Sequence, residues 1–193
     1  MNTQMPFARF LLLAAALGAL LVTTGVQAQV ACPLTLPFAS YAAKFVCGPL
    51  GTDTDVVKGR YATTVNIHNP QVTVDVQFCK KAVIALPESS ATLGDISPKV
   101  LEILPPDRAM GVTCDDIRSL FPPTTNLPFH IEGFVVIQVP SQGAVGAASI
   151  PLLDVAAKYS ARHRNSTTAG TDPTLSDVET LEVLPIFPQQ ITQ

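Results

Sequence analysis

The sequence predicts an all-β fold, an immunoglobulin-like two-sheet sandwich of seven or eight strands with one short helical turn near residues 115–121. Short apolar segments with period-two alternation recur along the chain, without βαβ alternation. The 17 prolines favour short strands and turns over long helices. The chain has no tryptophan, so its likeness to antibody domains concerns architecture alone. A closed β-barrel is the alternative architecture.

The longest alternating segment, Arg60 to Leu86, is predicted to be a β-hairpin. Asn69-Pro70-Gln71 is expected to turn the chain between the two arms, residues 61–68 and 72–86, because Pro fixes φ and Asn tolerates turn geometry. Lys80 falls on the apolar face of the second arm, so we expect a bulge that rotates a lysine outward. The predicted inner faces hold Tyr61, Thr63, Val65 and Ile67 in the first arm, and Val72, Val74, Val76, Phe78, Ala82, Ile84 and Leu86 in the second.

The remaining elements are shorter. Asp115 and Asp116 open the expected helical turn, where acids suit the helix dipole, and Pro122-Pro123 ends it. Gly133 inside a strand pattern predicts a bulge or close packing. Further strands are predicted over residues 40–46, 99–104, 109–113, 129–139, 150–162 and 179–185, separated by loops such as 48–55, 88–98 and 163–176.

Residues 1–28 are predicted to be a secretory signal peptide. Residues 1–9 carry one positive charge and no acid, residues 10–22 are almost wholly apolar, and small side chains precede the expected cleavage before Gln29. The predicted organisation is a signal peptide (1–28), an N-terminal strap (29–39), a single β-sandwich domain (40–187) and a C-terminal tail (188–193). We therefore expect an exported protein, in the periplasm or outside the cell. A retained membrane anchor is the alternative.

The four cysteines, Cys32, Cys47, Cys79 and Cys114, all follow the predicted cleavage site. An even count in an oxidising compartment predicts two disulfides, and no C-x-x-C pair suggests zinc or redox chemistry. Of the three possible pairings, we favour Cys47 with Cys114 and Cys32 with Cys79. A different chemistry is open to Cys32, because residues 29–32 faintly resemble a lipoprotein cleavage box. Acylation of Cys32 would tether the protein to a membrane.

Six short motifs resemble, in the same order, those of a group of uncharacterised exported bacterial proteins. The likeness covers about residues 40 to 184. The resemblance implies that cysteines matching Cys47 and Cys114 recur as a pair, and it implies no activity. The motifs are Lys44-Phe-Val-Cys-Gly48, Asn66-Ile-His-Asn-Pro70, Lys80-Lys81, Cys114-Asp-Asp-Ile117, Gly133-Phe-Val-Val-Ile137, and Leu153-Asp-Val155 with Tyr159.

The histidines are the candidates for proton transfer near neutral pH. His68, beside the Asn69-Pro70 turn, is expected to hold that turn by hydrogen bonding. His130 and Glu132 share a strand face and could supply two metal ligands, but no third ligand lies within sequence reach, so no metal or other cofactor is predicted. His163 is expected to be exposed in a polar loop.

Other polar groups favour structural roles. Asp115 and Asp116 could act as a paired acid and base, but capping the helical turn is the favoured interpretation. Asp53 and Asp55 lie in a loop without the EF-hand pattern, which favours a solvated turn over a calcium site. Lysines 44, 80, 81 and 158 could form a basic strip, although surface lysines also protect edge strands. The sequon Asn165-Ser166-Thr167 is given no role.

Charge and motif content restrict the classes of function that the sequence supports. A net charge of −3, scattered along the chain, predicts no nucleic-acid partner, and membrane contact is expected only if Cys32 is acylated. No nucleophile elbow or phosphate-binding loop is present. We therefore predict a non-enzymatic binding or assembly module that acts through exposed strand edges. The alternatives are a secreted hydrolase using His130, Glu132 and an acid from another strand, or a lipid-anchored envelope protein.

Overall fold

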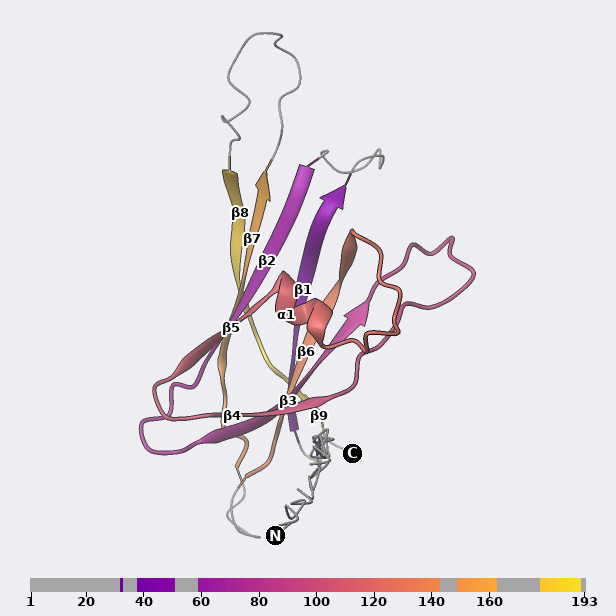
Figure 1. Ribbon diagram of the computed structural model, residues 1–193. Helices are drawn as coiled ribbons and strands as arrows, with labels where there is room; N and C mark the ends of the chain where they lie inside the picture. Colours follow the sequence, from indigo (N-terminus) through magenta and orange to yellow (C-terminus); the bar gives the residue numbers. More distant parts are fainter. Residues whose placement is uncertain (1–31, 33–37, 51–58, 143–148, 163–177, 192–193) are drawn as a thin grey trace, which may run out of the picture.

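The computed structural model describes residues 32, 38–50, 59–142, 149–162 and 178–191 (Figure 1). The predicted signal peptide, the Asp53 and Asp55 loop, His163 and the sequon lie outside the described residues. Nine strands and one short helix form the described chain: β1 (Phe38–Leu50), β2 (Gly59–His68), β3 (Val76–Ile84), β4 (Val100–Leu104), β5 (Ala109–Thr113), α1 (Cys114–Ser119), β6 (Ile131–Pro140), β7 (Asp154–Arg162), β8 (Val178–Ile186) and β9 (Gln189–Ile191).

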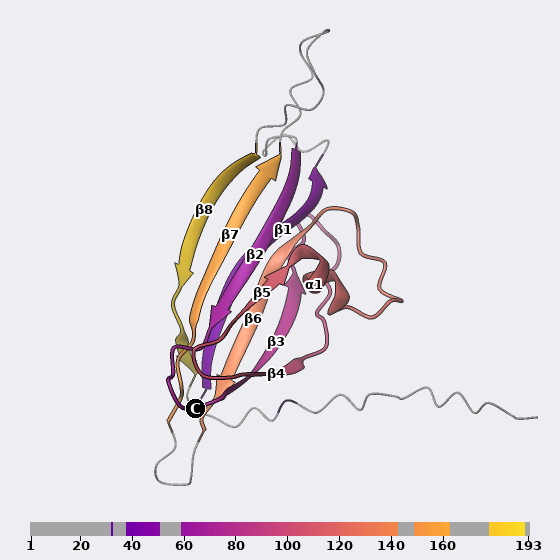
Figure 2. The same ribbon diagram turned by 60° about the vertical axis from the view of Figure 1, so that its left-hand side comes forward.

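All strand pairs are antiparallel, which confirms the all-β prediction with its one short helix. The hydrogen-bonded order is β4-β3-β6-β1-β2-β7-β8, with β5 also on β2 and β9 also on β1. This path begins at β4 and ends at β8 without joining them, so the described strands form no closed barrel. The segment predicted as a tail contributes β9, which pairs with the start of β1. Figure 2 shows how the strands curve together from β8 and β7 towards β3.

The predicted hairpin is wrong. Its two arms exist as β2 and β3, but they do not pair: β2 pairs with β1, β5 and β7, whereas β3 pairs with β4 and β6. Alternation correctly identified the inner faces of both strands, because Val65, Ile67 and Phe78 are fully buried. However, Leu86, which follows β3, is exposed. Val72 and Val74, which precede β3, are exposed as well. They belong to a connection that carries the chain to a different part of the sheet.

One apolar core lies inside the curve. Inward-facing residues alternate along every central strand, and β1 and β6 together supply Ala39, Tyr41, Ala43, Phe45, Ile131, Val135, Ile137 and Val139. The Tyr41 hydroxyl accepts a hydrogen bond from the Leu153 N–H at 2.8 Å, which joins β1 to the residue preceding β7 across this core. Burial raises the pKa of the Tyr41 phenol above its ordinary value. The core therefore connects the two halves of the sheet, β4-β3-β6 on one side of β1 and β2-β7-β8 on the other.

Strand β1 joins these halves by changing partners. It pairs with β6 from Phe38 to Cys47 and then with β2 from Gly48 to Leu50. At the change, Thr63 of β2 accepts a hydrogen bond from the Val46 N–H at 2.9 Å and donates one to the Val46 carbonyl at 3.0 Å. Cys47 forms a disulfide with Cys114, so α1 is covalently attached at the same point. The second disulfide joins Cys32 to Cys79, and the favoured pairing is confirmed.

Gly48 and Gly133 lie where backbones approach closely. Gly48 has a φ of +101°, and a Cβ placed on it would lie 1.9 Å from the Phe129 carbonyl oxygen. A Cβ on Gly133 would lie 2.0 Å from the Val83 carbonyl oxygen, which confirms the predicted close packing. The change of partner by β1 therefore depends on a residue without a side chain.

The predicted outward rotation of a lysine at a bulge in β3 is also wrong for Lys80. The register of β3 with β6 runs without a break from Cys79 to Ile84. Lys80 points inward, is 8% exposed, and its Nζ contacts Glu102 Oε1 of β4 at 2.6 Å. The register shift that does occur lies in the pairing of β7 with β8, between Tyr159 and Ser160. An ion pair with the neighbouring strand, rather than a bulge, accommodates Lys80.

Replacing Gly48 by alanine is expected to lower the free energy of unfolding by about 2 kcal/mol or more. The new Cβ would clash with the Phe129 backbone, and alanine is strained at the positive φ of this position. Urea unfolding followed by circular dichroism measures the change. Gly111→Ala is the matched control: its Cβ meets its nearest described atom, Thr64 Cγ2, at 3.5 Å, and a change within about 1 kcal/mol is expected. Equal losses in both variants would contradict the role given to Gly48.

Candidate functional site at the corner of the sheet

A cluster of hydrogen-bonded polar residues around His68 and Asn69 lies where a ribbon of two paired strands turns a corner. Strand β2 pairs with β5 before the corner, and β3 pairs with β4 after it. The two connections, residues 69–75 and 105–108, lie side by side. Asn69 donates its backbone N–H to the Arg108 carbonyl at 2.9 Å, and Asp107 donates its own to the Gln71 carbonyl at 3.0 Å. Both strands of the ribbon therefore cross the sheet together.

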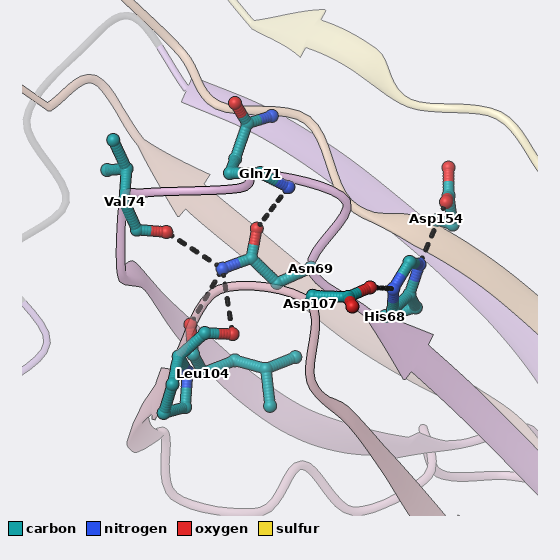
Figure 3. Close-up of polar contacts among 8 residues, drawn as sticks. His68, Asn69, Gln71, Val74, Leu104, Asp107 and Asp154 are labelled. Atoms are coloured by element: carbon teal, nitrogen blue, oxygen red, sulfur yellow. Dashed lines mark hydrogen bonds and ion pairs between the residues drawn. The ribbon is translucent and has the colours of Figure 1, made fainter.

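The Asn69 side chain fills the inside of this corner (Figure 3). It is completely buried, and its Nδ2 lies 2.9 Å from the Val74 and Leu104 carbonyl oxygens and 3.1 Å from that of Pro105. Its Oδ1 accepts the Gln71 N–H at 3.0 Å, a local side-chain contact of the kind Asn makes in turns, but the segment leads into a corner and not into the predicted turn between paired arms. Two amide hydrogens serve three carbonyls, so at least one hydrogen is shared. One side chain thus satisfies the buried Leu104 carbonyl and partly buried backbone groups on both connections.

His68 lies at the edge of the same corner, between two carboxylates (Figure 3). Its Nδ1 is 3.1 Å from Asp154 Oδ2, on the strand directly opposite, and its Nε2 is 3.4 Å from Asp107 Oδ1. Asp107 adopts a φ of +53°, a conformation that Asp tolerates better than most residues. The hydrogen bonds to Asp154 and then to Asp107 raise the pKa of His68 above its ordinary value.

These contacts determine what the cluster can do. In its protonated form, the imidazole donates one ring N–H to each carboxylate, so neither nitrogen is available as a general base or a metal ligand. The arrangement joins β2, β7 and the β4–β5 connection in one ion-paired contact. The hydrogen-bonding role predicted for His68 is confirmed, but its partners come from elements distant in sequence.

The other candidate pair, His130 and Glu132, forms no site in the described part of the chain. The His130 ring packs edge-on against Tyr61 with centroids 6.4 Å apart, and its Nδ1 is buried without a hydrogen-bond partner among the described residues. No described carboxylate pairs with His130. Across the described ranges, no group of three or more His, Cys, Asp or Glu residues could hold a metal ion.

Asp116 serves as a cap, as predicted. Thr113 is the N-cap of α1, and the Asp116 carboxylate accepts hydrogen bonds from the Thr113 hydroxyl at 2.7 Å and the Thr113 N–H at 2.8 Å. These bonds lower the pKa of the Asp116 carboxyl. Asp115 lies in the same first turn. The structure gives these acids a local structural role at the helix start.

The predicted strip of four lysines does not form. Lys44, Lys81 and Lys158 point away from the core, but Lys80 faces inward against Glu102. Sequence reasoning also missed Asp107 and Asp154 as partners of His68. Only the β2–β7 register, which pairs His68 with Asp154, and the corner, which brings Asp107 close, could reveal them.

Comparisons with protein-family models, with curated proteins and with solved structures find no match for this chain. Within the described residues, no helix has the length and apolar character needed to cross a membrane.

Replacing Asn69 by alanine is expected to lower the free energy of unfolding by about 3 kcal/mol, because the buried Leu104 carbonyl and the partly buried Val74 and Pro105 carbonyls lose their donor. Asn69→Asp is expected to cost more, since it turns a carboxylate towards the same carbonyls. Asn66→Ala, at an exposed position of β2, serves as the control and should change stability by less than about 0.5 kcal/mol. Urea unfolding measures all three. Equal effects at positions 66 and 69 would contradict the proposed role.

The stabilisation by His68 is expected to depend on pH. Because the folded-state pKa is raised, the contribution is complete below the unfolded pKa of about 6.5 and is lost as pH rises through the folded pKa. Wild type should exceed His68→Gln in stability most at about pH 5, where the carboxylates remain ionised, and the difference should shrink above neutral pH. Urea unfolding at each pH measures it. A difference that stays constant from pH 5 to 9 would contradict this assignment, and Asp107→Asn with Asp154→Asn should abolish the pH dependence.

Proposed function

We propose that this chain is an exported, non-catalytic binding or assembly module with an immunoglobulin-like sandwich architecture, acting at the cell envelope or outside the cell. Its proposed mode of action is pairing of an exposed strand edge with a strand of a partner or of a second copy. The observation that carries the proposal is the open path of the sheet, which ends at β4 and β8.

The two edge strands, β4 and β8, differ in how much unpaired backbone they present to a partner strand. Strand β4 has five residues and lies between Pro98 and Pro105-Pro106, so its length and its flanking prolines protect it. Strand β8 has nine residues and pairs with β7, while no described strand pairs with its other edge. Pro185 near its end lacks an N–H, which leaves the preceding residues as the longer backbone edge. We assign partner pairing to β8.

Export is supported by the predicted signal peptide, by the resemblance to exported bacterial proteins, and by two disulfides. The sandwich architecture is supported by antiparallel strands whose inward residues share one core. The hydrolase alternative has less support, because no described carboxylate pairs with His130 and the buried His130 Nδ1 has no hydrogen-bond partner among the described residues. Lipid anchoring also has less support, because the Cys32 sulfur is bound to Cys79 and is not free for acylation.

Photo-crosslinking in the native host tests the proposal. A photoreactive residue replaces Thr180 in β8 and, as a matched control, Thr64 in β2, which has strands on both sides. We expect the β8 position, and not the β2 position, to crosslink to one defined partner or to a second copy. Intact mass of the same material should show cleavage before Gln29 and four fewer hydrogens than the reduced chain. Free monomer at both positions would contradict strand-edge binding, and an acylated Cys32 would contradict the Cys32–Cys79 disulfide.

A further inference from the structure

Besides its strand edges, the molecule has an unusual outer sheet surface. On β1, β6, β3 and β4, the residues between the core-facing ones point away from the core. The register places Lys44 opposite Phe134, Phe134 opposite Val83, and Val83 in a bridge with Ile96. The adjacent row holds Ala42, Val136 and Lys81. We call these two rows, together with Lys99, the outer face.

The middle of the outer face is apolar and partly open to solvent. Phe134 is 42% exposed and Ile96 is 62% exposed, and both lie in one row with the half-buried Val83. In an antiparallel sheet, side chains directly opposite one another form a continuous contact surface. A surface of this kind, rimmed by charged groups, is typical of an interaction site.

The charges on the outer face are mainly positive and unpaired. Lys44, Lys81 and Lys99 form no ion pair with any described carboxylate, whereas the inward-facing Lys80 is paired with Glu102. Lys99 immediately precedes β4, and partial burial together with the charge of Lys81 lowers the pKa of its ammonium group. The two like charges disfavour each other's charged form on this surface. Glu132 of β6 lies outside these two rows, in the row opposite Val46.

We propose that the outer face docks an acidic, apolar segment of a partner protein. Carboxylates of such a segment would neutralise Lys81 and Lys99 and relieve their repulsion, while its aliphatic side chains would cover Phe134 and Ile96. The protein's net charge of −3 opposes long-range attraction of any anionic partner, so the complementarity is confined to the outer face. Cys79, which forms the disulfide with Cys32, lies in the next row opposite Gln138 and is 1% exposed. This surface is separate from the β8 edge, so either proposal can fail alone.

A defined peptide tests the docking. The probe is a twelve-residue peptide that alternates Glu with Val and Leu, compared with the same peptide carrying Lys for Glu. Amide chemical shifts of the full chain are followed during titration, and affinity is measured by calorimetry. We expect the acidic peptide alone to bind, with shifts centred on Phe134, Val136 and Lys81. The double variant Lys81→Gln with Lys99→Gln should weaken binding about tenfold, and Lys158→Gln, on the outer side of β7, should leave it unchanged.

Several results would overturn the proposal: no binding of the acidic peptide, equal binding of both peptides, or shifts confined to other strands. Binding to vesicles that contain phosphatidylglycerol is measured to test the alternative that the outer face binds a membrane. Binding to those vesicles without binding to the peptide would replace the protein partner by a membrane surface. Unfolding curves of each variant confirm that lost binding does not reflect lost structure.

Discussion

The buried amide of Asn69 is the interaction on which the path of the chain depends. A ribbon of two strands can cross from one part of a sheet to another only if the backbone groups freed at the corner find partners. Asn69 supplies them for both strands, since its side chain contacts carbonyls of Val74, Leu104 and Pro105 and accepts the Gln71 N–H. Without it, one buried carbonyl and two partly buried carbonyls would lose their donor at once.

Other devices secure the rest of the fold around this corner. Gly48 lets β1 leave β6 and join β2, and Thr63 supplies hydrogen bonds where the strands diverge. The Cys47–Cys114 disulfide attaches α1 beside that point. His68 links β7 to the outside of the corner through exposed carboxylates. The most constrained residues therefore lie where the chain changes its pairing partner, because regular ladders end there.

The polar groups that stabilise the fold are distinct from the groups that we propose to bind partners. The polar groups with well-formed contacts, such as Asn69, His68 and Lys80, maintain the structure. The groups left open lie elsewhere, on the β8 edge and on the outer face with Phe134 and Lys81. Our two proposals place recognition at these open positions, where a partner can add contacts without disturbing the core.

The sequence by itself determined the elements and the faces of this protein. Alternation identified the inner residues of β2, and acids with flanking prolines identified α1, because these signals act within a few residues. Which strands pair was decided only by the tertiary structure. The hairpin prediction failed because an Asn-Pro pair is as compatible with a corner as with a tight turn. The carbonyls that bind the Asn69 side chain in the corner belong to Leu104 and Pro105, which are distant in sequence. For the same reason, Asp107 and Asp154 could not be predicted as partners of His68: their approach depends on strand register, a property of distant segments.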